Sequence, residues 1–563
     1  MRAVKVATYL MILLSFFLVL STAHATTSPL EETISHRLST RNYTNENIAS
    51  QQLLEVLWSS YGYFNARRNV PQIGNDYSLT IFAVNGTGSY RYIPENNSLI
   101  VHDLSVNKEI IRPHDQGWPS NASVVLIIVW NQTKMNNGYL ASAEAGCVVQ
   151  NVYLASVSLG LGTCCVGGIS SQGLRSDLKL PSTMIPLVVM PLGYPAEPYP
   201  QASPNYEFMA GNLPPVQYGE LSFEDSIRNM LFTQIWPAEN LSLQKLSQLL
   251  WAAYGYTNVT HDTSYHRTTP SAYGIYPLVI YVSNATGIYQ YLPENHSTAE
   301  ILLGDRRSDV ANACSNQSWA AKAPTIFIIG YNASYNNGNT GDGGAVSHEF
   351  IEVDAGAVIQ QLFLEASAWN LSANIVADGL EDWNGTGAEE LRSILNLPPS
   401  LIPLYIVPVG SRIIDSTAPT INTPSQDPEP TSVEPYQNVT ITVSVVDEET
   451  GVREVILSYT IDEGITWTNT TMNNITAYTY IGKIPGFEAG TYVKYKIIAY
   501  DYADNIAIED KNGEYYVYTV VSEFYDSILL ILMMVTLIAV IMIKIKKHFS
   551  FKHLKSNLKQ TTS

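Results

Sequence analysis

Cysteine is scarce in this chain. Four cysteines are present among 563 residues, and none of them has the spacing of a metal site: Cys147, Cys164, Cys165 and Cys314. A disulfide-stabilised scaffold needs a higher density of cysteines than this. We therefore expect these side chains to be small buried hydrophobic groups, with a disulfide as the alternative. The ten histidines also lack metal or catalytic-triad spacing, so no metal is predicted.

Positively charged residues are also few. The chain has 31 lysines and arginines against 50 aspartates and glutamates, which gives a formal net charge of −19. Such a balance repels phosphate backbones and anionic lipid surfaces. It argues against nucleic acid or anionic lipid as a partner.

Two uncharged apolar runs lie near the ends of the chain. The first, residues 9–20, follows Arg2 and Lys5 and leads into small residues, so residues 1–25 are predicted to be a signal peptide, with a membrane anchor as the alternative. The second, residues 527–543, precedes a lysine-rich end. It predicts a transmembrane helix over 525–543 and a basic cytoplasmic tail over 544–563, with a buried core helix as the alternative. A single-pass cell-membrane protein with its N-terminal part outside is expected.

Sixteen Asn-x-Ser/Thr sequons are spread along the chain between these two runs. An Asn-rich and Thr-rich chain contains several by chance, so no single one is evidence. Their number predicts a glycosylated surface.

Proline-rich breaks divide the region between the runs. They occur within 195–215 and 417–435, where neither a helix interior nor a central strand is compatible with the prolines. The predicted domains are 30–195 and 216–412, joined by a linker over 196–215, and then 416–521. In the last of these, alternating apolar residues and regular turns predict a β-sandwich of immunoglobulin or fibronectin type, which we interpret as a stalk, with adhesion as the lesser alternative.

The first two domains are copies of each other. LWSSYGY at Leu57 recurs as LWAAYGY at Leu250, YRYIPENNS at Tyr90 as YQYLPENHS at Tyr289, and IPLVVMPLG at Ile185 as IPLYIVPVG at Ile402. Each copy mixes helices and strands and is predicted to be α+β. In the first copy, a helix over about 141–159 is apolar on nearly every side. We expect it to pack against the second copy as well as its own sheet.

The opening motif of the first copy, HRLSTRNY, carries donors at alternate positions: Arg37, Ser39 and Arg41. In an extended segment these three side chains lie on one side and could hold a phosphate and a polar ring edge. Alone, the motif is weak evidence, because such a pattern can be a solvated surface strip. It is followed by the LW-x-x-YG helix, the EAGCVVQNVYLASVSLGLG helix from Glu144, and Gly167-Gly168.

This ordered set resembles the FMN-dependent nitroreductase family, and within it the azoline (thiazole/oxazole) dehydrogenase branch. The resemblance covers 30–195 and again 220–412. In that family the flavin lies at a dimer interface. The resemblance implies that Arg37 contacts the phosphate, Ser39 the phosphate or ribityl chain, and Arg41 flavin N1 and O2. The backbone of Gly167 and Gly168 would approach N5 and O4, where a side chain would obstruct.

The two copies keep different halves of such a site. By alignment on Trp58 and Trp251, the second copy has Met230, Phe232 and Gln234 in place of the donors, and Asp378-Gly379 in place of the glycines. It retains the family's Pro-Ser segment, which the first copy has lost: Pro270, Ser271 and Ala272. The retained halves add up to one composite site, which predicts an intramolecular pseudo-dimer that binds one FMN.

Some features depart from the family pattern. Leu38 replaces an arginine of the opening motif, and YPAEPYP after the last strand of the first copy has no basic residue. The lysine and tyrosine with a catalytic role in azoline dehydrogenases map only loosely to Lys134 and Tyr139, so no catalytic residue is assigned. The sequence thus predicts a membrane-anchored, extracytoplasmic FMN-dependent oxidoreductase acting on a small-molecule or peptide substrate. The alternative is a non-catalytic surface protein that binds ligands or mediates adhesion.

Overall fold

A computed structural model describes residues 28–64, 67–114, 117–199, 202–204, 211–259, 266–336, 346–380, 385–413, 415–476, 478–521 and 531–547. The chain divides into two compact units, Met1–Ile413 and Ile414–Ser563. The predicted signal peptide, residues 1–25, lies outside the described residues.

The first copy is built on a six-stranded antiparallel sheet of order β5-β4-β3-β6-β8-β7. Apolar β-branched residues fill its central strand, β6, which is buried over Val124–Val129. The strands are β3 (Leu79–Val84), β4 (Ser89–Ile93), β5 (Ser98–Asp103), β6 (Val124–Asn131), β7 (Gly162–Thr163) and β8 (Met184–Gly193). The helices are α2 (Leu30–Ser35), α3 (Ser50–Tyr61), α4 (Gly138–Ser158) and α5 (Ser171–Asp177).

The second copy repeats this arrangement strand for strand. Its sheet has the order β14-β13-β12-β15-β17-β16. The strands are β12 (Leu278–Asn284), β13 (Gly287–Leu292), β14 (Ser297–Leu303), β15 (Thr325–Asn332), β16 (Leu371–Ala373) and β17 (Leu401–Ser411). The helices are α6 (Phe223–Asn229), α7 (Leu243–Tyr254), α8 (Arg307–Ala313), α9 (His348–Ala368) and α10 (Thr386–Ile394).

Short strands flank the two sheets. β1 (Tyr63–Phe64) pairs with β2 (Arg67–Arg68) in the first copy. In the second, β10 (Tyr256–Val259) pairs with β11 (His266–Arg267) and with β9 (Ala202–Pro204). β9 lies in the predicted linker and is the edge strand of its sheet, a position that tolerates proline.

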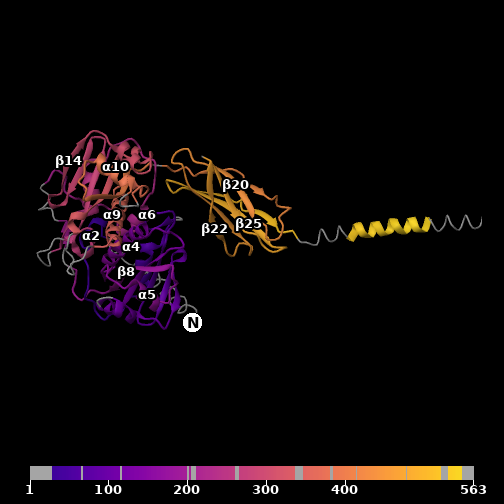
Figure 1. Ribbon diagram of the computed structural model, residues 1–563, viewed down its shortest axis with the longest axis horizontal. Helices are drawn as coiled ribbons and strands as arrows, with labels where there is room; N and C mark the ends of the chain where they lie inside the picture. Colours follow the sequence, from indigo (N-terminus) through magenta and orange to yellow (C-terminus); the bar gives the residue numbers. More distant parts are fainter. Residues whose placement is uncertain are drawn as a thin grey trace, which may run out of the picture. The chain divides into compact units, whose positions relative to one another are not determined.

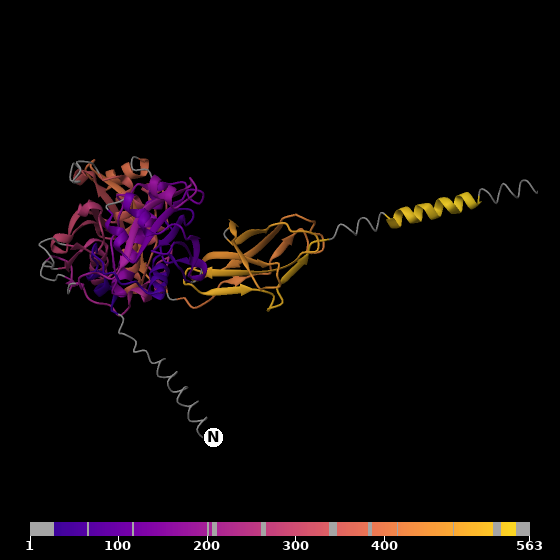
Figure 2. The ribbon, with the colours of Figure 1, turned by 90° about the horizontal axis from the view of Figure 1, so that it is seen from below.

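The long helices α4 and α9 lie side by side at the centre of the first unit (Figure 1), and Figure 2 shows the two copies packed together in a second view. They cross at Gly146 and Gly356. A Cβ on Gly146 would stand 2.1 Å from the Val353 carbonyl oxygen, and one on Gly356 would stand 1.9 Å from that of Ala143. The helix expected to be buried on nearly every side is therefore buried against the second copy, and this expectation is confirmed.

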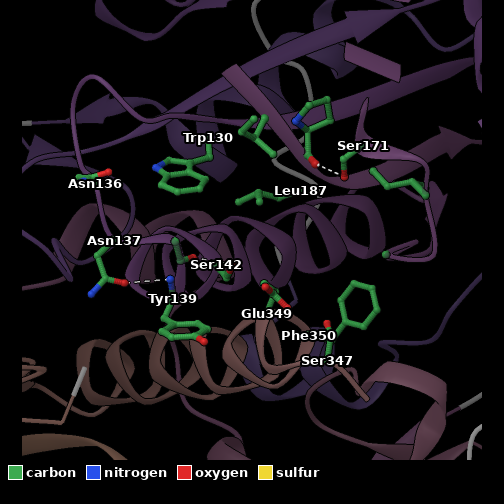
Figure 3. A pocket seen from close by; sticks show the side chains of 15 residues that line it. Trp130, Asn136, Asn137, Tyr139, Ser142, Ser171, Leu187, Ser347, Glu349 and Phe350 are labelled. Carbon is green, nitrogen blue, oxygen red and sulfur yellow. Dashed lines mark hydrogen bonds between the residues drawn. The ribbon is translucent and has the colours of Figure 1, made fainter. Parts of the chain in front are cut away.

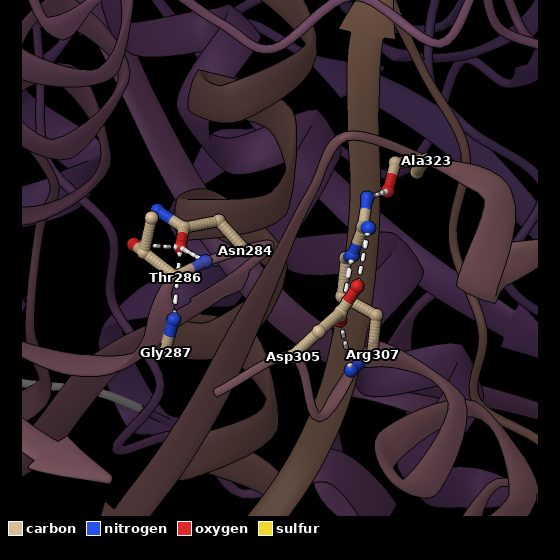
Figure 4. A network of polar contacts seen from close by, with 6 residues as sticks. All are labelled: Asn284, Thr286, Gly287, Asp305, Arg307 and Ala323. Atoms are coloured by element: carbon tan, nitrogen blue, oxygen red, sulfur yellow. Dashed lines mark hydrogen bonds and ion pairs between the residues drawn. The ribbon is translucent and has the colours of Figure 1, made fainter. Parts of the chain in front are cut away.

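Polar turns are repeated along with the sheets. Asn284 Oδ1 accepts hydrogen bonds from the Thr286 and Gly287 backbone N–H groups at 2.8 and 3.2 Å (Figure 4). Asn85 makes the same turn with Thr87 and Gly88 in the first copy. Close by in the second copy, Arg307 pairs with Asp305 and donates to the Ala323 carbonyl (Figure 4). Such side-chain turns fix the loop between two strands without an apolar core.

The second unit is a β-sandwich. One sheet has the order β18-β20-β24-β23, with β19 on β20, and the other β22-β21-β25-β26, with β27 on β25. Alternate residues of β20 are buried in the core between them. The strands are β18 (Thr420–Ile421), β19 (Ser425–Asp427), β20 (Val439–Val446), β21 (Val452–Thr460), β22 (Thr468–Thr471), β23 (Asn473–Thr476), β24 (Thr479–Ile484), β25 (Tyr492–Asp501), β26 (Ile506–Glu509) and β27 (Tyr516–Thr519).

The expected transmembrane helix over 525–543 is wrong. Residues 531–547 are helical. Across the described parts of the chain, no helix is long and apolar enough to span a membrane. The predicted membrane attachment and single-pass location, which depended on that helix, are corrected accordingly. Residues 548–563 of the predicted tail lie outside the described residues.

Candidate functional site

A cavity of about 680 Å³ and a neighbouring one of about 630 Å³ meet where α4 and α9 begin. The second of these, here called the interface cavity, is lined by every residue that the sequence predicted to hold a cofactor. The first copy contributes Arg37, Ser39, Arg41, Gly167 and Gly168, and the second contributes Pro270, Ser271 and Ala272. Residues that are between 102 and 235 positions apart in the sequence are thus brought together by the packing of the two copies.

Arg37 is held in the wall of the interface cavity immediately after α2. It is 2% exposed, and its Nη2 donates to the Arg267 carbonyl oxygen at 2.9 Å. Its guanidinium lies 5.1 Å from the centre of the Tyr153 ring. The remaining Nη1 is buried without a hydrogen-bond partner. A buried cationic donor left unpaired is costly, which favours an anionic acceptor in this cavity.

Ser39 and Arg41 extend the donor strip from Arg37 toward solvent. The Ser39 hydroxyl lies 2.9 Å from the Tyr153 hydroxyl, which also accepts a hydrogen bond from the Cys165 backbone N–H at 2.8 Å. Arg41 is exposed at the cavity mouth. Burial raises the pKa of the Tyr153 phenol and the Cys165 thiol well above their ordinary values, so both groups are neutral.

The two glycines differ in what surrounds them. A Cβ on Gly168 would meet no atom within 4 Å, whereas one on Gly167 would lie 2.3 Å from the Phe350 ring of α9. Gly168 therefore leaves open space against the cavity, where a ligand could approach the backbone. Gly167 is needed in addition for close contact with the second copy, a constraint that the sequence did not reveal.

Ser271 contributes a side-chain hydroxyl from the second copy to the interface cavity. Its Oγ donates to Asp354 Oδ2 at 2.7 Å, and the Ala272 backbone N–H donates to Asp354 Oδ1 at 3.1 Å. Asp354 is 4% exposed and lines the same cavity. Burial raises its pKa to about 7. Sequence reasoning missed this residue, although the alignment of EVDAG with SAEAG places it opposite Glu144.

At the equivalent position with the roles of the two copies exchanged, the arginines and the serine of the opening motif are missing. A cavity of about 720 Å³ there is lined by Gln234, Gln317, Asp378 and Lys134, among others, and none of its described lining residues is an arginine. The Ser39–Tyr153 hydroxyl pair is replaced by Phe232 and Phe363, whose ring centres are 5.2 Å apart. The contacts Val166–Val189 and Val376–Ile406 align Gly168 with Asp378, which shifts the alignment predicted from the sequence by one residue.

Arg68 and Arg267, which both copies retain, have a structural role. The Arg68 guanidinium lies 4.3 Å from the ring centre of Tyr61 and donates to the Tyr61 carbonyl at 3.1 Å. Arg267 does the same with Tyr254, at 4.4 and 3.0 Å. These arginines fix the backbone ahead of the Pro-Ser segment and its counterpart and do not line the interface cavity.

The neighbouring 680 Å³ cavity shares Gly167 and Phe350 with the interface cavity. Figure 3 shows Trp130, Tyr139 and Phe350 around it, with Glu349 at the start of α9. Glu349 is its single charged side chain among the described lining residues. Tyr139 lines this cavity whereas Lys134 lines the opposite one, so the structure does not bring the loosely mapped pair together in one site.

The four cysteines lie in or beside the hydrophobic cores, as expected. Cys147 and Cys314 are completely buried in two different cores, and Cys164 is 3% exposed. Cys165 is half-buried in the interface-cavity wall.

Comparison with known proteins fits this architecture. The sequence profile of the nitroreductase family matches residues 34–194 and 237–411, once in each copy. Because 336 of 563 residues are matched, more than half of the chain is covered. The chain belongs to the nitroreductase family. It is an oxidoreductase with two tandem nitroreductase copies, and this family generally binds flavin.

A curated relative and two solved structures are similar to this nitroreductase-family chain. A protein of Methanocaldococcus jannaschii named "Putative nitroreductase" is 31% identical over 207 residues, which cover 36% of this chain and 96% of the relative. A crystal structure from Anabaena variabilis, titled a "putative nitroreductase", has a TM-score of 0.50 at 15% identity and covers 69% of this chain and 93% of its own. One from Parabacteroides distasonis, titled "Putative NADH dehydrogenase/NAD(P)H nitroreductase", has a TM-score of 0.24 at 18% identity, with coverages of 32% and 96%.

The Anabaena likeness bears on the fold of the first unit as a whole. Each family match spans 161 or 175 residues, about three tenths of this chain. A likeness over 69% of the chain therefore includes parts of both copies.

Proposed function

We propose that this oxidoreductase binds one FMN per chain in the interface cavity, between its two nitroreductase copies. The observation that carries the proposal is the convergence of the donors and glycines of one copy with the Pro-Ser segment of the other in a single cavity. A volume of about 630 Å³ lies within the range usual for cofactor sites. The unpaired, buried Nη1 of Arg37 supplies an independent reason for an anionic group to bind there.

In this proposal each residue has a defined task toward the cofactor. Arg37 binds the phosphate through Nη1 while its other nitrogens remain on the Arg267 carbonyl. Ser39 binds the phosphate or ribityl chain, and Arg41 adds positive charge near flavin N1 and O2. Gly167 and Gly168 present backbone N–H groups without a side chain in front of the ring. FMN would supply two-electron transfer, while the protein supplies position and electrostatics.

We further propose that the substrate occupies the neighbouring cavity shown in Figure 3. Gly167 and Phe350 belong to both cavities, so a ligand there would lie against the one in the interface cavity. The described lining residues combine aromatic rings with one carboxylate, that of Glu349. This surrounding favours an aromatic electron acceptor that is neutral or cationic over one that is anionic.

The test is flavin binding by the full-length chain, measured by absorbance and by quenching of added FMN fluorescence. The variants Arg37→Met and Arg41→Gln convert the first copy's donors into the residues of the second copy. We expect each to weaken FMN binding, by about tenfold to a hundredfold for the buried arginine and by less for the exposed one. Gln234→Ala, at the opposite cavity, serves as the matched control and should leave binding unchanged.

The stoichiometry decides between one site and two. One FMN per chain supports the composite site. Two FMN molecules per chain, or an equal loss on Gln234→Ala, would refute the single-site proposal. A wild-type chain that binds no FMN would refute the proposed cofactor altogether.

A further inference from the structure

Each long central helix carries a buried acidic residue at the equivalent position, two residues before the crossing glycine. Glu144 on α4 is 1% exposed and Asp354 on α9 is 4% exposed. The duplication thus provides two versions of one acidic position. Their hydrogen bonds differ.

Glu144 is bound entirely within the core of its own copy. It accepts hydrogen bonds from the Tyr61 hydroxyl, from the Ser78 backbone N–H at 3.0 Å and from the Ser78 hydroxyl at 2.7 Å. It does not line the interface cavity. Its role is to join α4 to α3 and to the start of β3.

Asp354 is one methylene shorter and makes different contacts. The hydroxyl of Tyr254, the counterpart of Tyr61, accepts from the Leu278 backbone N–H at 3.1 Å. Asp354 instead accepts from Ser271 Oγ at 2.7 Å and from the Ala272 N–H. Among the ion pairs of the described residues, none involves Asp354. The shorter acid therefore reaches the cavity-lining Pro-Ser segment.

The hydrogen-bond pattern of Ser271 depends on the charge of Asp354. The Ser271 hydroxyl has one proton, which it donates to Asp354, while its oxygen accepts from the Tyr276 backbone N–H at 3.0 Å. With Asp354 ionised, this hydroxyl has no proton left for a ligand. With Asp354 protonated, the carboxyl O–H donates to the second lone pair of Ser271 Oγ, and the hydroxyl proton is released to point into the cavity.

We propose that Asp354 is a positioning residue that controls the Ser271 hydroxyl, so that Ser271 donates a hydrogen bond to the bound ligand only while Asp354 holds a proton. The inference rests on the proposed function in taking the ligand to be FMN, whose ring edge carries several hydrogen-bond acceptors. It adds a proton-dependent contact that the first copy, with Glu144 on Ser78, cannot make.

The surroundings of Asp354 allow both the protonated and the ionised carboxyl group near neutral pH. Burial raises its pKa to about 7, and its hydrogen bonds from Ser271 and Ala272 act in the opposite direction. The Tyr254 phenol on α7 and the Cys165 thiol both face it, and burial raises the pKa of each, so they stay neutral. The other ionisable groups of the cavity wall and the adjoining segment are Arg37, Arg41, Tyr153, Cys164, His266, Tyr273 and Tyr276.

The experiment compares FMN binding by the wild type and by Asp354→Asn from about pH 5 to about pH 9, which brackets a neutral titration. The amide of the variant donates to Ser271 Oγ and accepts from Ala272 N–H, so it copies the protonated acid without titrating. We expect the two Kd values to agree at the acidic end. At the alkaline end the wild type should bind about fivefold more weakly, the effect of one neutral hydrogen bond. Because both proteins bind the same FMN, titration of its phosphate cancels in the ratio.

Glu144→Gln is the matched control, because it makes the same chemical change at the equivalent position away from the cavity. It should retain the wild-type pH dependence. Ser271→Ala combined with Asp354→Asn should bind as Ser271→Ala alone does at every pH. A Kd ratio of wild type to Asp354→Asn that stays constant with pH overturns the proposal, as does a pH dependence that Glu144→Gln abolishes equally. Near-ultraviolet circular dichroism verifies that each variant is folded.

A second measurement needs no flavin. The infrared carboxyl band of the ligand-free protein should contain a component that titrates near neutral pH and is absent from Asp354→Asn. If the wild type binds no FMN, the proposed cofactor fails, and this band alone decides whether Asp354 holds its proton. If that band is missing below neutral pH, the inference about Asp354 fails even if FMN binds.

Discussion

Replacement of Gly356 by alanine tests the close crossing of α4 and α9, on which the composite site depends. The added Cβ would stand 1.9 Å from the Ala143 carbonyl oxygen, and real Cβ contacts essentially never fall below 3.0 Å. The two helices must therefore separate locally by about 1.1 Å or more. Both atoms in conflict are held in helical backbone, so rotation of a side chain cannot relieve the contact.

The magnitude follows from two opposing effects. Alanine has a higher helix propensity than glycine, worth up to about 1 kcal/mol in favour of the variant. Overpacking of a tight interface costs about 1–3 kcal/mol, and a gap of 0.5–1 Å removes a quarter to a half of each van der Waals contact along the crossing. We expect the second effect to prevail, with a net loss of up to about 2 kcal/mol from the free energy of unfolding.

Urea denaturation followed by tryptophan fluorescence measures this loss, and FMN titration shows its effect on the site. Separation of α4 from α9 would also shift Phe350 from Gly167, so FMN binding should weaken together with stability. Gly86→Ala is the control, because a Cβ on Gly86 would meet nothing within 4 Å. If Gly356→Ala unfolds at the same urea concentration as the wild type, or at a higher one, the helices do not cross as closely as the structure has them.

Three further predictions concern the acids and glycines of the cavities. Asp354 binds a proton more tightly when folded, so its contribution to stability is fully present below its unfolded pKa of about 3.9 and is lost as pH rises through about 7. Asp354→Asn should therefore gain stability over the wild type between pH 5 and pH 8, by at most about 4 kcal/mol in chemical denaturation. Gly167→Ala should lower the melting temperature because of the Phe350 ring, whereas Gly168→Ala should leave it unchanged and reduce FMN affinity. Glu349→Gln should reduce the preference for 4-nitrobenzylamine over 4-nitrobenzoate by about fivefold in anaerobic reoxidation of photoreduced flavin, and Glu55→Gln on α3 should not.

The secondary structure of the first copy was predictable because its apolar patterns are regular. The helix expected over about 141–159 is α4, which begins three residues earlier and ends one residue earlier. The strands of the β-sandwich were also predictable from alternating apolar residues, as in β20, where alternate residues are buried. The prediction failed at 525–543, because no helix among the described residues is long and apolar enough to cross a membrane.

The candidate site was only partly predictable. Its eight residues come from motifs that can be aligned between the copies, and all of them line one cavity. The role of Asp354 was not predictable, because the residue differs from Glu144 by a single methylene. Only the three-dimensional structure shows that its carboxylate accepts a hydrogen bond from Ser271 and not from Tyr254. The segment from Glu144 to Gly168 is as long as that from Asp354 to Asp378, so alignment of the long helices would have placed Asp378 opposite Gly168, as the strand contacts of Val166 and Val376 do.

The asymmetry of the two copies has a physical basis in their covalent linkage. In a dimer of identical chains, every substitution occurs in both sites at once, so a change that fills one site fills the other. In a single chain, Phe232 can pack on Phe363 and lie 5.2 Å below the Arg67 guanidinium, while its counterpart Ser39 keeps a hydroxyl for the cavity. Arg67 donates to the Met230 carbonyl at 2.6 Å, so the segment that would have held a second ligand now strengthens the contact between the copies. Covalent linkage likewise permits an aspartate at position 354 while position 144 remains a glutamate. The interface cavity thereby has an acidic contact that, in a symmetric dimer, would be present in both sites.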